Sequence, residues 1–433
     1  MKTLISILSI MLLCRINSYA QKTHSFDSTA VQESQFAPRT YLPLLIDPGL
    51  TMRSGSQNII TFHKGLALTE DKLIGTSWFS ESNILGKTGG VLGRFTKYVF
   101  IDTPVDYFSI ILAHEYFGHG ARYRELNFDY IDYGFDMPPP YGPGGGEASL
   151  NSSKPISKHE LMAIWEGGVE IHSIINRNLS LRWMTTKEID YREASLYFWS
   201  FQIMMSYIQD TNEDLGDGTK DNDPRAYVRI INSNAGYTDV ANLKMSVKEL
   251  KSKMIINAAN PFVFYSMFSI LKTFMWDGDK SNAVPTISFG AVNYLPGLRA
   301  GLTPFGVEYH FENYFRFNNK VSLVDISYGD QTFFDSWGGI GVFIQNIFEA
   351  NNSSFDLHCN FWKQPGIKFV RIPSESKDSG FGAAFSVRGY FDFPNSDFPF
   401  LAVLELGYKS TGFLEGYDLD AAPILMVGFA LRN

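Results

Sequence analysis

The chain has 433 residues, of which 45% are hydrophobic and 15% aromatic, and its formal net charge is −8. That length allows two or three domains, and that hydrophobic content is enough for buried cores. An acidic chain without a cluster of Lys and Arg argues against nucleic acid as a partner.

The N-terminus has the layout of a secretory signal. Lys2 precedes an apolar run from Leu4 to Leu13, and Ser18-Tyr19-Ala20 ends in a small residue, as signal-peptidase sites do. We therefore predict that residues 1–20 are cleaved and that the protein is exported. A lipoprotein is the alternative, but Leu13 stands where a lipid-modified Cys14 needs a small residue before it.

Cleavage changes both the charge and the cysteine content. It removes two basic residues and no acidic ones, so the mature chain has 35 basic and 45 acidic residues and a net charge of about −10. Only Cys359 remains, so no intramolecular disulfide can form, and stability must come from burial.

The hydrophobic pattern predicts two domains after a polar lead segment at 21–60, which we leave unassigned. A helical domain is expected at 61–283, because apolar residues there occur in blocks of helical length, at 104–118, 158–177, 188–209 and 248–276. After Val284 the pattern changes to short alternating runs rich in Phe, Tyr and Gly.

The segment before the first histidine pair carries a helix start signal. Thr103 is placed as an N-cap, Pro104 as the first helical residue and Asp106 three residues after the cap. The run that follows is nearly all apolar, so we expect His114 on a helix that is buried on most sides.

The stretch HEYFGHG contains His114 and His119 five residues apart, with Glu115 directly after the first. On an ideal helix five residues span about 140° around the axis, so the two imidazoles could not bind one ion, whereas four residues leave about 40°. A π-bulge or a loosened last turn would return the second imidazole to the same face. Gly118 and Gly120 supply the backbone freedom for that distortion.

The motif His114-Glu115-Tyr116-Phe117-Gly118-His119 resembles the HExxGH zinc motif of the dipeptidyl peptidase III family. The resemblance implies that both histidines bind Zn2+ and that Glu115 acts on water. That family has its third ligand in a downstream EExxxE pattern. Here the matching stretch is WEGGVEIH, in which Trp165 stands in place of the first glutamate.

This second segment is also expected to be helical, because Ser157 and Glu160 form a capping box. Glu166 and Glu170 are four residues apart and share a face. Two carboxylates one turn apart repel each other unless a cation lies nearby, so we predict Glu166 as the third zinc ligand and Glu170 as the partner of a ligand imidazole.

Gly167 and Gly168 lie in the middle of this predicted helix, where each costs roughly 1 kcal/mol relative to alanine. Close approach of another helix, such as the one that carries His114, would explain why they are tolerated.

Two histidines and one carboxylate leave a fourth zinc position for water, whose pKa the ion lowers toward about 7. Glu115 would take the proton from that water and pass it to the leaving amine. His172 and Tyr116 are candidate donors to the oxyanion, with ordinary packing as the alternative for each.

Three further segments have two interpretations each. Asp214, Asp217, Asp221 and Asp223 in the loop 213–227 could bind Ca2+ or form a solvated acidic turn, because the EF-hand spacing is absent. The Pro/Gly-rich segment 137–146 is either a rim over the site or a linker. The apolar segment 255–275 is expected to be a buried core helix rather than a membrane span.

The C-terminal part, 284–433, is expected to form about eight antiparallel strands. They are placed at 286–295, 299–311, 314–328, 337–348, 353–362, 381–391, 400–409 and 423–432, with a weak ninth at 366–372. This segment resembles outer-membrane β-barrels, although it ends in Asn433 rather than an aromatic residue. A soluble β-sandwich is the alternative, because both architectures have one apolar and one polar face.

Together these features predict an α+β protein, with a mainly helical metallopeptidase-like domain followed by an antiparallel β-barrel. We expect an exported zinc metallopeptidase that acts on peptide or protein substrates and contacts outer-membrane lipid, with the periplasm as the alternative location. The competing hypothesis is a non-enzymatic barrel with a structural or relict zinc site, which would not require Glu115. No oligomeric state follows from the sequence.

Overall fold

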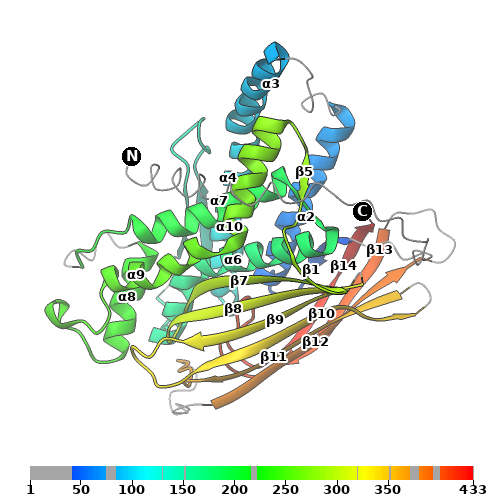
Figure 1. Ribbon diagram of the computed structural model, residues 1–433. Helices are drawn as coiled ribbons and strands as arrows, with labels where there is room; N and C mark the ends of the chain where they lie inside the picture. The colour runs from blue at the N-terminus through cyan, green and yellow to red at the C-terminus, as the bar shows by residue number, and fades with distance from the viewer. Residues whose placement is uncertain are drawn as a thin grey trace. The chain divides into compact units, whose positions relative to one another are not determined.

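Ten strands form one antiparallel sheet in a computed structural model of the chain (Figure 1). The structure describes residues 41–74, 84–128, 130–150, 153–215, 222–318, 320–350, 353–370, 380–393 and 400–432. The predicted signal at 1–20 therefore lies outside the described residues. In spatial order the strands are β1 (Tyr41–Ile46), β14 (Ala422–Arg432), β13 (Phe400–Lys409), β12 (Gly380–Asp392), β11 (Ser353–Gln364), β10 (Gly338–Ala350), β9 (Lys320–Gly329), β8 (Gly306–Phe317), β7 (Val292–Thr303) and β6 (Ile287–Phe289).

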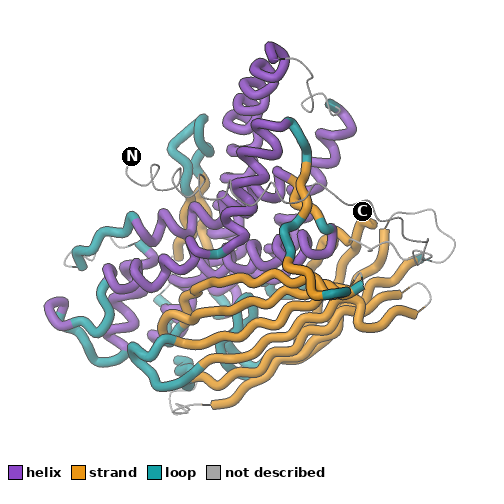
Figure 2. Tube along the Cα trace, in the orientation of Figure 1, coloured by secondary structure: helices purple, strands orange, loops and turns teal. Residues whose placement is uncertain are grey.

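The helices gather over one face of this sheet (Figure 2). Two short two-stranded antiparallel sheets accompany them, β2 (Ile131–Phe135) with β3 (Gly146–Leu150) and β4 (Glu188–Asp190) with β5 (Ser281–Ala283). Outside the segment that carries His114 and His119, the helices are α2 (Met52–Leu73), α6 (Lys158–Thr186), α7 (Tyr191–Gln209), α8 (Asp223–Asn234), η5 (Val240–Asn242), α9 (Val247–Met254), η6 (Ile255–Ala259), α10 (Pro261–Phe268) and η7 (Ser269–Asp277). The prediction of a helical part followed by antiparallel strands is thus confirmed.

The motif lies on an uninterrupted helical run from Ile84 to Glu125. Its segments are α3 (Ile84–Lys97), the π-helical η2 (Tyr98–Asp102), α4 (Thr103–Leu112), the π-helical η3 (Ala113–His119) and α5 (Gly120–Glu125). The predicted N-cap at Thr103 is wrong, because this residue has helical torsions, φ −54° and ψ −48°. The π turn of η2 ends just before Pro104 and accommodates its missing N–H, so the helix continues through it.

Helix α6 begins as predicted and crosses η3 closely. The Ser157 side chain accepts the Glu160 N–H, and the Glu160 side chain accepts the Ser157 N–H, which is the expected capping box. A Cβ on Gly118 would lie 2.7 Å from the Gly167 carbonyl oxygen, and a Cβ on Gly167 would lie 3.0 Å from that of Gly118. The predicted reason for glycines in the middle of this helix is therefore confirmed.

The helical part and the sheet share one hydrophobic core. Buried side chains of the helices, among them Trp183 and Phe262, cluster with Leu295, Tyr314 and Leu323 from the first strands of the sheet. Burial of such aromatic and aliphatic side chains is the main favourable term in folding. The change in sequence pattern near Val284 therefore marks a change of secondary structure within one core.

The two faces of the sheet differ in chemistry. The inner face contacts the helices, as when Arg316 donates to the Met184 carbonyl oxygen of α6 and Arg53 of α2 pairs with Glu405. Following the strand register, the outward positions of the described strands carry only two charged side chains, Lys320 and Lys363, each near a strand end. The sheet is thus apolar outside and carries its charges inside.

Side chains of two helices cap the edges of the sheet. Asn58 of α2 accepts the Leu45 N–H at 2.7 Å and donates to the Leu45 carbonyl at 2.8 Å, along the free side of β1. Asn257 of η6 does the same for Ala300 of β7, at 2.9 and 3.0 Å. Each amide replaces a neighbouring strand at one residue, which protects edges that would otherwise present unpaired backbone groups.

Strand order is linear, and no pairing joins β1 to β6 among the described strands. The predicted ends of the last five strands agree with β10 to β14 within about three residues. The first three were misplaced because Pro296-Gly297 resembles a turn but lies inside β7. Beyond Tyr294 that strand pairs on one side only, so proline's missing N–H costs no ladder bond.

The segment 255–275 is only half buried. Phe262 and Phe274 are buried, whereas Phe264 and Phe268 are exposed, so the predicted core helix has one open face. Among the described helices, none is by itself long and apolar enough to cross a membrane. One bent pair, Val240–Ala259 with Pro261–Asp277, meets the criteria of length and hydropathy when taken together.

We predict that the edge amides stabilise the sheet. Asn58→Ala or Asn257→Ala leaves two backbone groups unpaired, one N–H and one C=O, at a buried residue, which should lower the free energy of unfolding by about 1–3 kcal/mol in each variant. The measurement is the midpoint of denaturant unfolding. Thr69→Ala is the control, because its exposed hydroxyl bonds only to the Gly65 carbonyl at 2.8 Å and its loss should change stability by less than about 0.5 kcal/mol. Shifts no larger than the control's would contradict a capping role.

Candidate metal centre

The π-helical segment η3 brings the two histidines of the motif together. Their Nε2 atoms lie 3.2 Å apart, although five residues separate them. A π-helix closes its hydrogen bonds over five residues, so His114 and His119 are stacked on one face. The predicted distortion of the helix is confirmed.

The third member of the group is Asp223, the first residue of α8. Its Oδ2 lies 3.0 Å from Nε2 of His119 and 3.5 Å from Nε2 of His114. These atoms form a buried triad of His, His and Asp that could hold a metal ion. The side chain of Asn222 accepts the Arg225 N–H and so caps the helix start that carries Asp223.

The spacing of the three ligand atoms fits a small tetrahedral ion. Zn2+ takes His nitrogen and carboxylate oxygen at about 2.0–2.2 Å, so two ligands at the tetrahedral angle lie about 3.3–3.5 Å apart. The observed edges of 3.0, 3.2 and 3.5 Å are close to that value. Three protein ligands leave one tetrahedral position for water or substrate.

Gly168 of α6 leaves space at this point. A Cβ there would lie 2.4 Å from Nε2 of His114 and 2.7 Å from Nε2 of His119. Any side chain at this position would therefore displace the two ligand nitrogens.

Hydrogen bonds behind the imidazoles turn both Nε2 atoms toward the centre. Nδ1 of His119 donates to the Ile164 carbonyl at 2.7 Å, and Nδ1 of His114 lies 3.0 Å from Nε2 of His172. Burial, together with the two nearby imidazoles, lowers the pKa of His172 well below its usual value, so this ring is neutral and accepts the proton of His114. These tautomers leave lone pairs on both ligand nitrogens.

The charge balance of the triad favours a cation. Burial by itself lowers the pKa of His119, but the adjacent Asp223 carboxylate more than offsets this and raises it to about 9. The same contact lowers the pKa of Asp223 despite its burial. Without an ion a proton therefore occupies the site, and a metal must compete with it below about pH 9.

Glu115 is also buried and faces β3. A Cβ on Gly146, the first residue of that strand, would lie 2.8 Å from Cγ of Glu115. Its charge reaches the centre, because it contributes to the raised pKa of His119. The segment 137–146 thus ends against the side chain predicted to be the general base, which favours a rim over a linker.

Tyr207 of α7 is a residue of the site that the sequence did not indicate. Its hydroxyl donates to Oδ2 of Asp223 at 2.9 Å, and its ring packs edge-on to His114 with centroids 5.6 Å apart. This hydrogen bond orients the carboxylate oxygen that faces both histidines.

Glu166, the predicted third ligand, is not part of the triad. Two residues on a helix span about 200°, so Glu166 lies opposite Gly168, the residue that faces the histidines. Its side chain is fully buried, and neither carboxylate oxygen has a hydrogen-bond partner among the described residues. Burial and the nearby Glu170 raise the pKa of this carboxyl well above its usual value.

The other predicted residues lie elsewhere. Glu170 binds no imidazole: its oxygens accept from Arg122 at 2.7 Å and from the Gly416 N–H at 2.6 Å. His172 lies behind His114 rather than facing the open position. Arg124 covers the ring of Tyr116, with 4.7 Å to its centroid, so Tyr116 has a packing role.

The predicted calcium ligands are not gathered in the described part of the loop. Asp223 faces the histidines, and the backbone N–H of Asp214 donates to Asn212 in a local turn. Asp217 and Asp221 lie outside the described residues.

No family model matches the chain, and neither a curated protein nor a solved structure matches it.

We predict that Asp223, and not Glu166, is needed to bind the metal. Asp223→Asn and Glu166→Gln each remove one carboxylate and keep the side chain's size. The first should lower zinc affinity by about two orders of magnitude, because it replaces a charged ligand, and the second should leave it unchanged. Dialysis against a competing chelator followed by elemental analysis measures this difference. Retention in Asp223→Asn with loss in Glu166→Gln would reverse the assignment.

Proposed function

We propose that this protein is an exported zinc-dependent hydrolase, with a metallopeptidase as the best-supported type. The observation that carries the proposal is the triad of His114, His119 and Asp223, with edges of 3.0 to 3.5 Å and Glu115 directly after the first ligand. A purely structural zinc site is usually closed by four protein ligands and requires no such acid.

The residues around the triad have distinct roles in this proposal. A zinc ion bound there would act as a Lewis acid and lower the pKa of water. Glu115 accepts the proton of the attacking water and delivers it to the leaving amine. His172 and the Ile164 carbonyl hold the two imidazoles, and Tyr207 holds Asp223, so the geometry exists before substrate arrives.

A peptide substrate is supported by the strand beside Glu115. Among the described strands β3 pairs only with β2, so its other side offers backbone N–H and C=O groups. An extended peptide can add to such an edge, where main-chain hydrogen bonds position it whatever its side chains. The resemblance of the motif to that of the dipeptidyl peptidase III family is consistent with this substrate class.

The alternative function is a non-enzymatic membrane protein with a structural or relict zinc site. The close packing of Glu115 against the start of β3 favours this alternative, because a Cβ on Gly146 would lie 2.8 Å from its Cγ. In that case Glu115 has a packing role and is not a base. The test of Glu115 below distinguishes the two.

We further propose that the sheet lies in the outer membrane as a barrel-like wall whose seam is covered by helices. The support is the distribution of polar and apolar side chains, since the outer face is apolar and the charges lie on the inner face. A soluble sandwich has its apolar face inside, whereas a membrane barrel has it outside. Aromatic side chains occupy outward positions near both ends of the strands, as in membrane barrels. At one end these are Tyr309, Tyr328, Phe361, Phe381 and Tyr408, and at the other Phe289, Phe317, Phe348, Phe400 and Phe429.

The covered seam is part of the same proposal. Lipid cannot hydrogen-bond to a free strand edge, so a membrane sheet must satisfy its edge groups internally. Asn58 and Asn257 do this at Leu45 and Ala300. The helices beside these edges present exposed apolar residues, such as Phe62 on α2 and Phe264 on α10.

We predict that Glu115→Gln retains zinc and fold but loses activity. Glutamine keeps the size of the side chain and removes the base, so hydrolysis of a mixed peptide library should fall by about two or more orders of magnitude. Glu213→Gln on the exposed surface is the control and should act like wild type. Equal activity in Glu115→Gln would refute the mechanism, and a wild type that binds zinc but cleaves nothing would favour the non-enzymatic alternative.

We predict that Leu406→Lys impairs the protein if the sheet is in lipid. Leu406 is 53% exposed at an outward position within β13. Lysine near the middle of a bilayer costs about 2–4 kcal/mol, whereas an exposed substitution in water costs less than about 0.5 kcal/mol. The measurement is the share of protein in outer-membrane fractions with heat-dependent gel mobility. Thr411→Lys, at an exposed residue of the loop after β13, is the control. A freely soluble wild type, or equal behaviour of the two variants, would exclude the membrane.

A further inference from the structure

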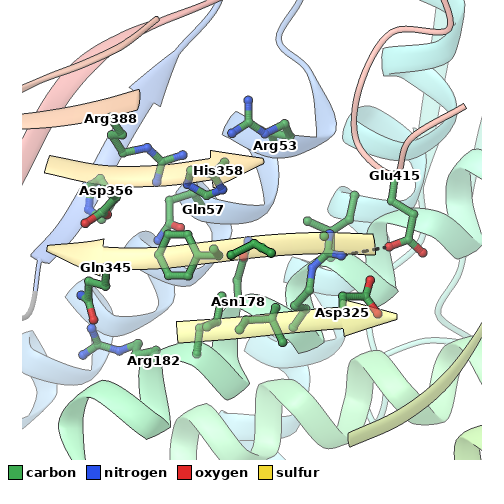
Figure 3. A pocket seen from close by; sticks show the side chains of 18 of the residues that line it. Arg53, Gln57, Asn178, Arg182, Asp325, Gln345, Asp356, His358, Arg388 and Glu415 are labelled. Carbon is green, nitrogen blue, oxygen red and sulfur yellow. Dashed lines mark ion pairs between the residues drawn. The ribbon is translucent and has the colours of Figure 1, made fainter. Parts of the chain in front are cut away.

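A polar cavity of about 190 Å³ lies between the inner face of the sheet and helices α2 and α6 (Figure 3). Its walls come from β9 to β12, from the C-terminal half of α6 and from the loop between β13 and β14. None of the residues of the metal triad lines it. It is therefore separate from the centre described above.

One end of the cavity is rich in donors. Arg53 and Arg388 share one carboxylate, Glu405, at 2.5 and 2.7 Å. Nη1 of Arg53 is buried and has no hydrogen-bond partner, and the same is true of Nε2 of His358. Asp356, at the same end, accepts the Asn346 N–H at 2.9 Å.

The other end carries the carboxylates of Asp325 and Glu415. Oδ2 of Asp325 is 2.9 Å from Nδ1 of His310, but its Oδ1 is buried without a hydrogen-bond partner. Glu415 binds Arg299 through Oε1, while its Oε2 has no hydrogen bond and lies 3.3 Å from Nη1 of Arg177. Figure 3 shows Arg53, Arg388 and His358 toward one end of the cavity and Asp325 and Glu415 toward the other.

The two ends of the cavity carry unpaired polar atoms of opposite kinds, on donor side chains at one end and on carboxylates at the other. Buried polar atoms in native proteins nearly always have partners, so unpaired ones on side chains that line a cavity indicate an occupant. A guanidinium N–H forms its strongest hydrogen bonds with an anionic oxygen, and two carboxylate oxygens form theirs with an ammonium group. We propose that the cavity binds a small zwitterion of the α-amino acid class, with its carboxylate at Arg53 and its ammonium at Asp325 and Glu415.

The size of the cavity limits the ligand. An apolar cavity of about 150 Å³ is known to hold one benzene ring, so about 190 Å³ suits six to nine non-hydrogen atoms, the range from alanine to leucine. The remaining polar lining, including the amides of Gln57, Asn178 and Asn360, can bond to the ligand's second oxygen or to water. A longer peptide does not fit within this volume.

Binding is tested by titration calorimetry on the purified full-length protein, which needs no catalytic activity, so failure of the proposed hydrolysis leaves the test intact. The probes are glycine, L-alanine and L-leucine, with acetate, methylamine and N-acetyl-L-alanine as ligands that carry one charge only. At least one amino acid should bind saturably at one site, at least about tenfold more tightly than the three single-charge probes.

Variants assign the two ends of the ligand. Arg53→Gln and Asp325→Asn should each weaken amino-acid binding by about tenfold or more. Arg182→Gln is the matched control: Arg182 lines the same cavity but bonds to Glu193 at 2.8 Å, so its loss should change affinity by less than about threefold. Arg53→Lys keeps the charge beside Glu405 and replaces Arg53→Gln if that variant does not fold. A circular-dichroism spectrum like that of the wild type serves as the check on folding.

Two results would overturn the proposal. A cavity filled by solvent alone gives no saturable binding of any amino acid up to about 10 mM. Binding that survives Arg53→Gln and Arg53→Lys with wild-type affinity, or that acetate alone reproduces, places the ligand elsewhere or reduces it to a simple anion.

Discussion

The contact between the backbones of η3 and α6 is the constraint on which the candidate metal centre depends. Gly118 and Gly167 let the two helices approach until a Cβ on either one would clash with the other's carbonyl oxygen. At that distance one helix does three things: the Ile164 carbonyl orients His119, His172 orients His114, and Gly168 leaves space in front of both. A shift of about 1 Å in this packing would separate ligands from their supports, which is why the glycines outweigh their cost in helix propensity.

The part of the site that could be predicted is the part encoded locally. A five-residue spacing between histidines, flanked by glycines, requires a π turn if both bind one ion, and η3 is that turn. Asp223 could not be found this way, because it lies 104 residues after His119 and reaches it only through the packing of α8 on α6. Helical periodicity correctly put Glu166 and Glu170 on one face. Periodicity could not show which face of α6 lies against the histidines, and in the structure this is the face that carries Gly168.

The sheet shows the same division. Strands bounded by strong turn segments, such as β12 and β13, were located closely, whereas the interior Pro296-Gly297 of β7 was mistaken for a turn. β1 was missed because it is six residues long and pairs with β14, nearly four hundred residues later. Alternation predicted two chemically different faces, but only the position of the helices, over the charged face, shows which of them is inside (Figure 2). That assignment is a tertiary property, and no periodicity contains it.

The loop between β13 and β14 links the sheet to the candidate metal centre. Its Gly416 N–H binds Glu170, its Tyr417 carbonyl accepts from Arg122 at 2.9 Å, and Arg122 lies one turn after His119 on the same helical run. Without this loop the buried Glu170 and Arg122 would keep each other, and Arg122 would keep Glu125, but each would lose a backbone partner in the loop. A buried donor or acceptor left without a partner costs about 1–3 kcal/mol, and more if it is charged. The helical part is therefore stable in its observed form only with the sheet beneath it. Any ion that binds the triad stabilises both parts together, because binding to the native state alone lowers the free energy of the whole cooperative unit.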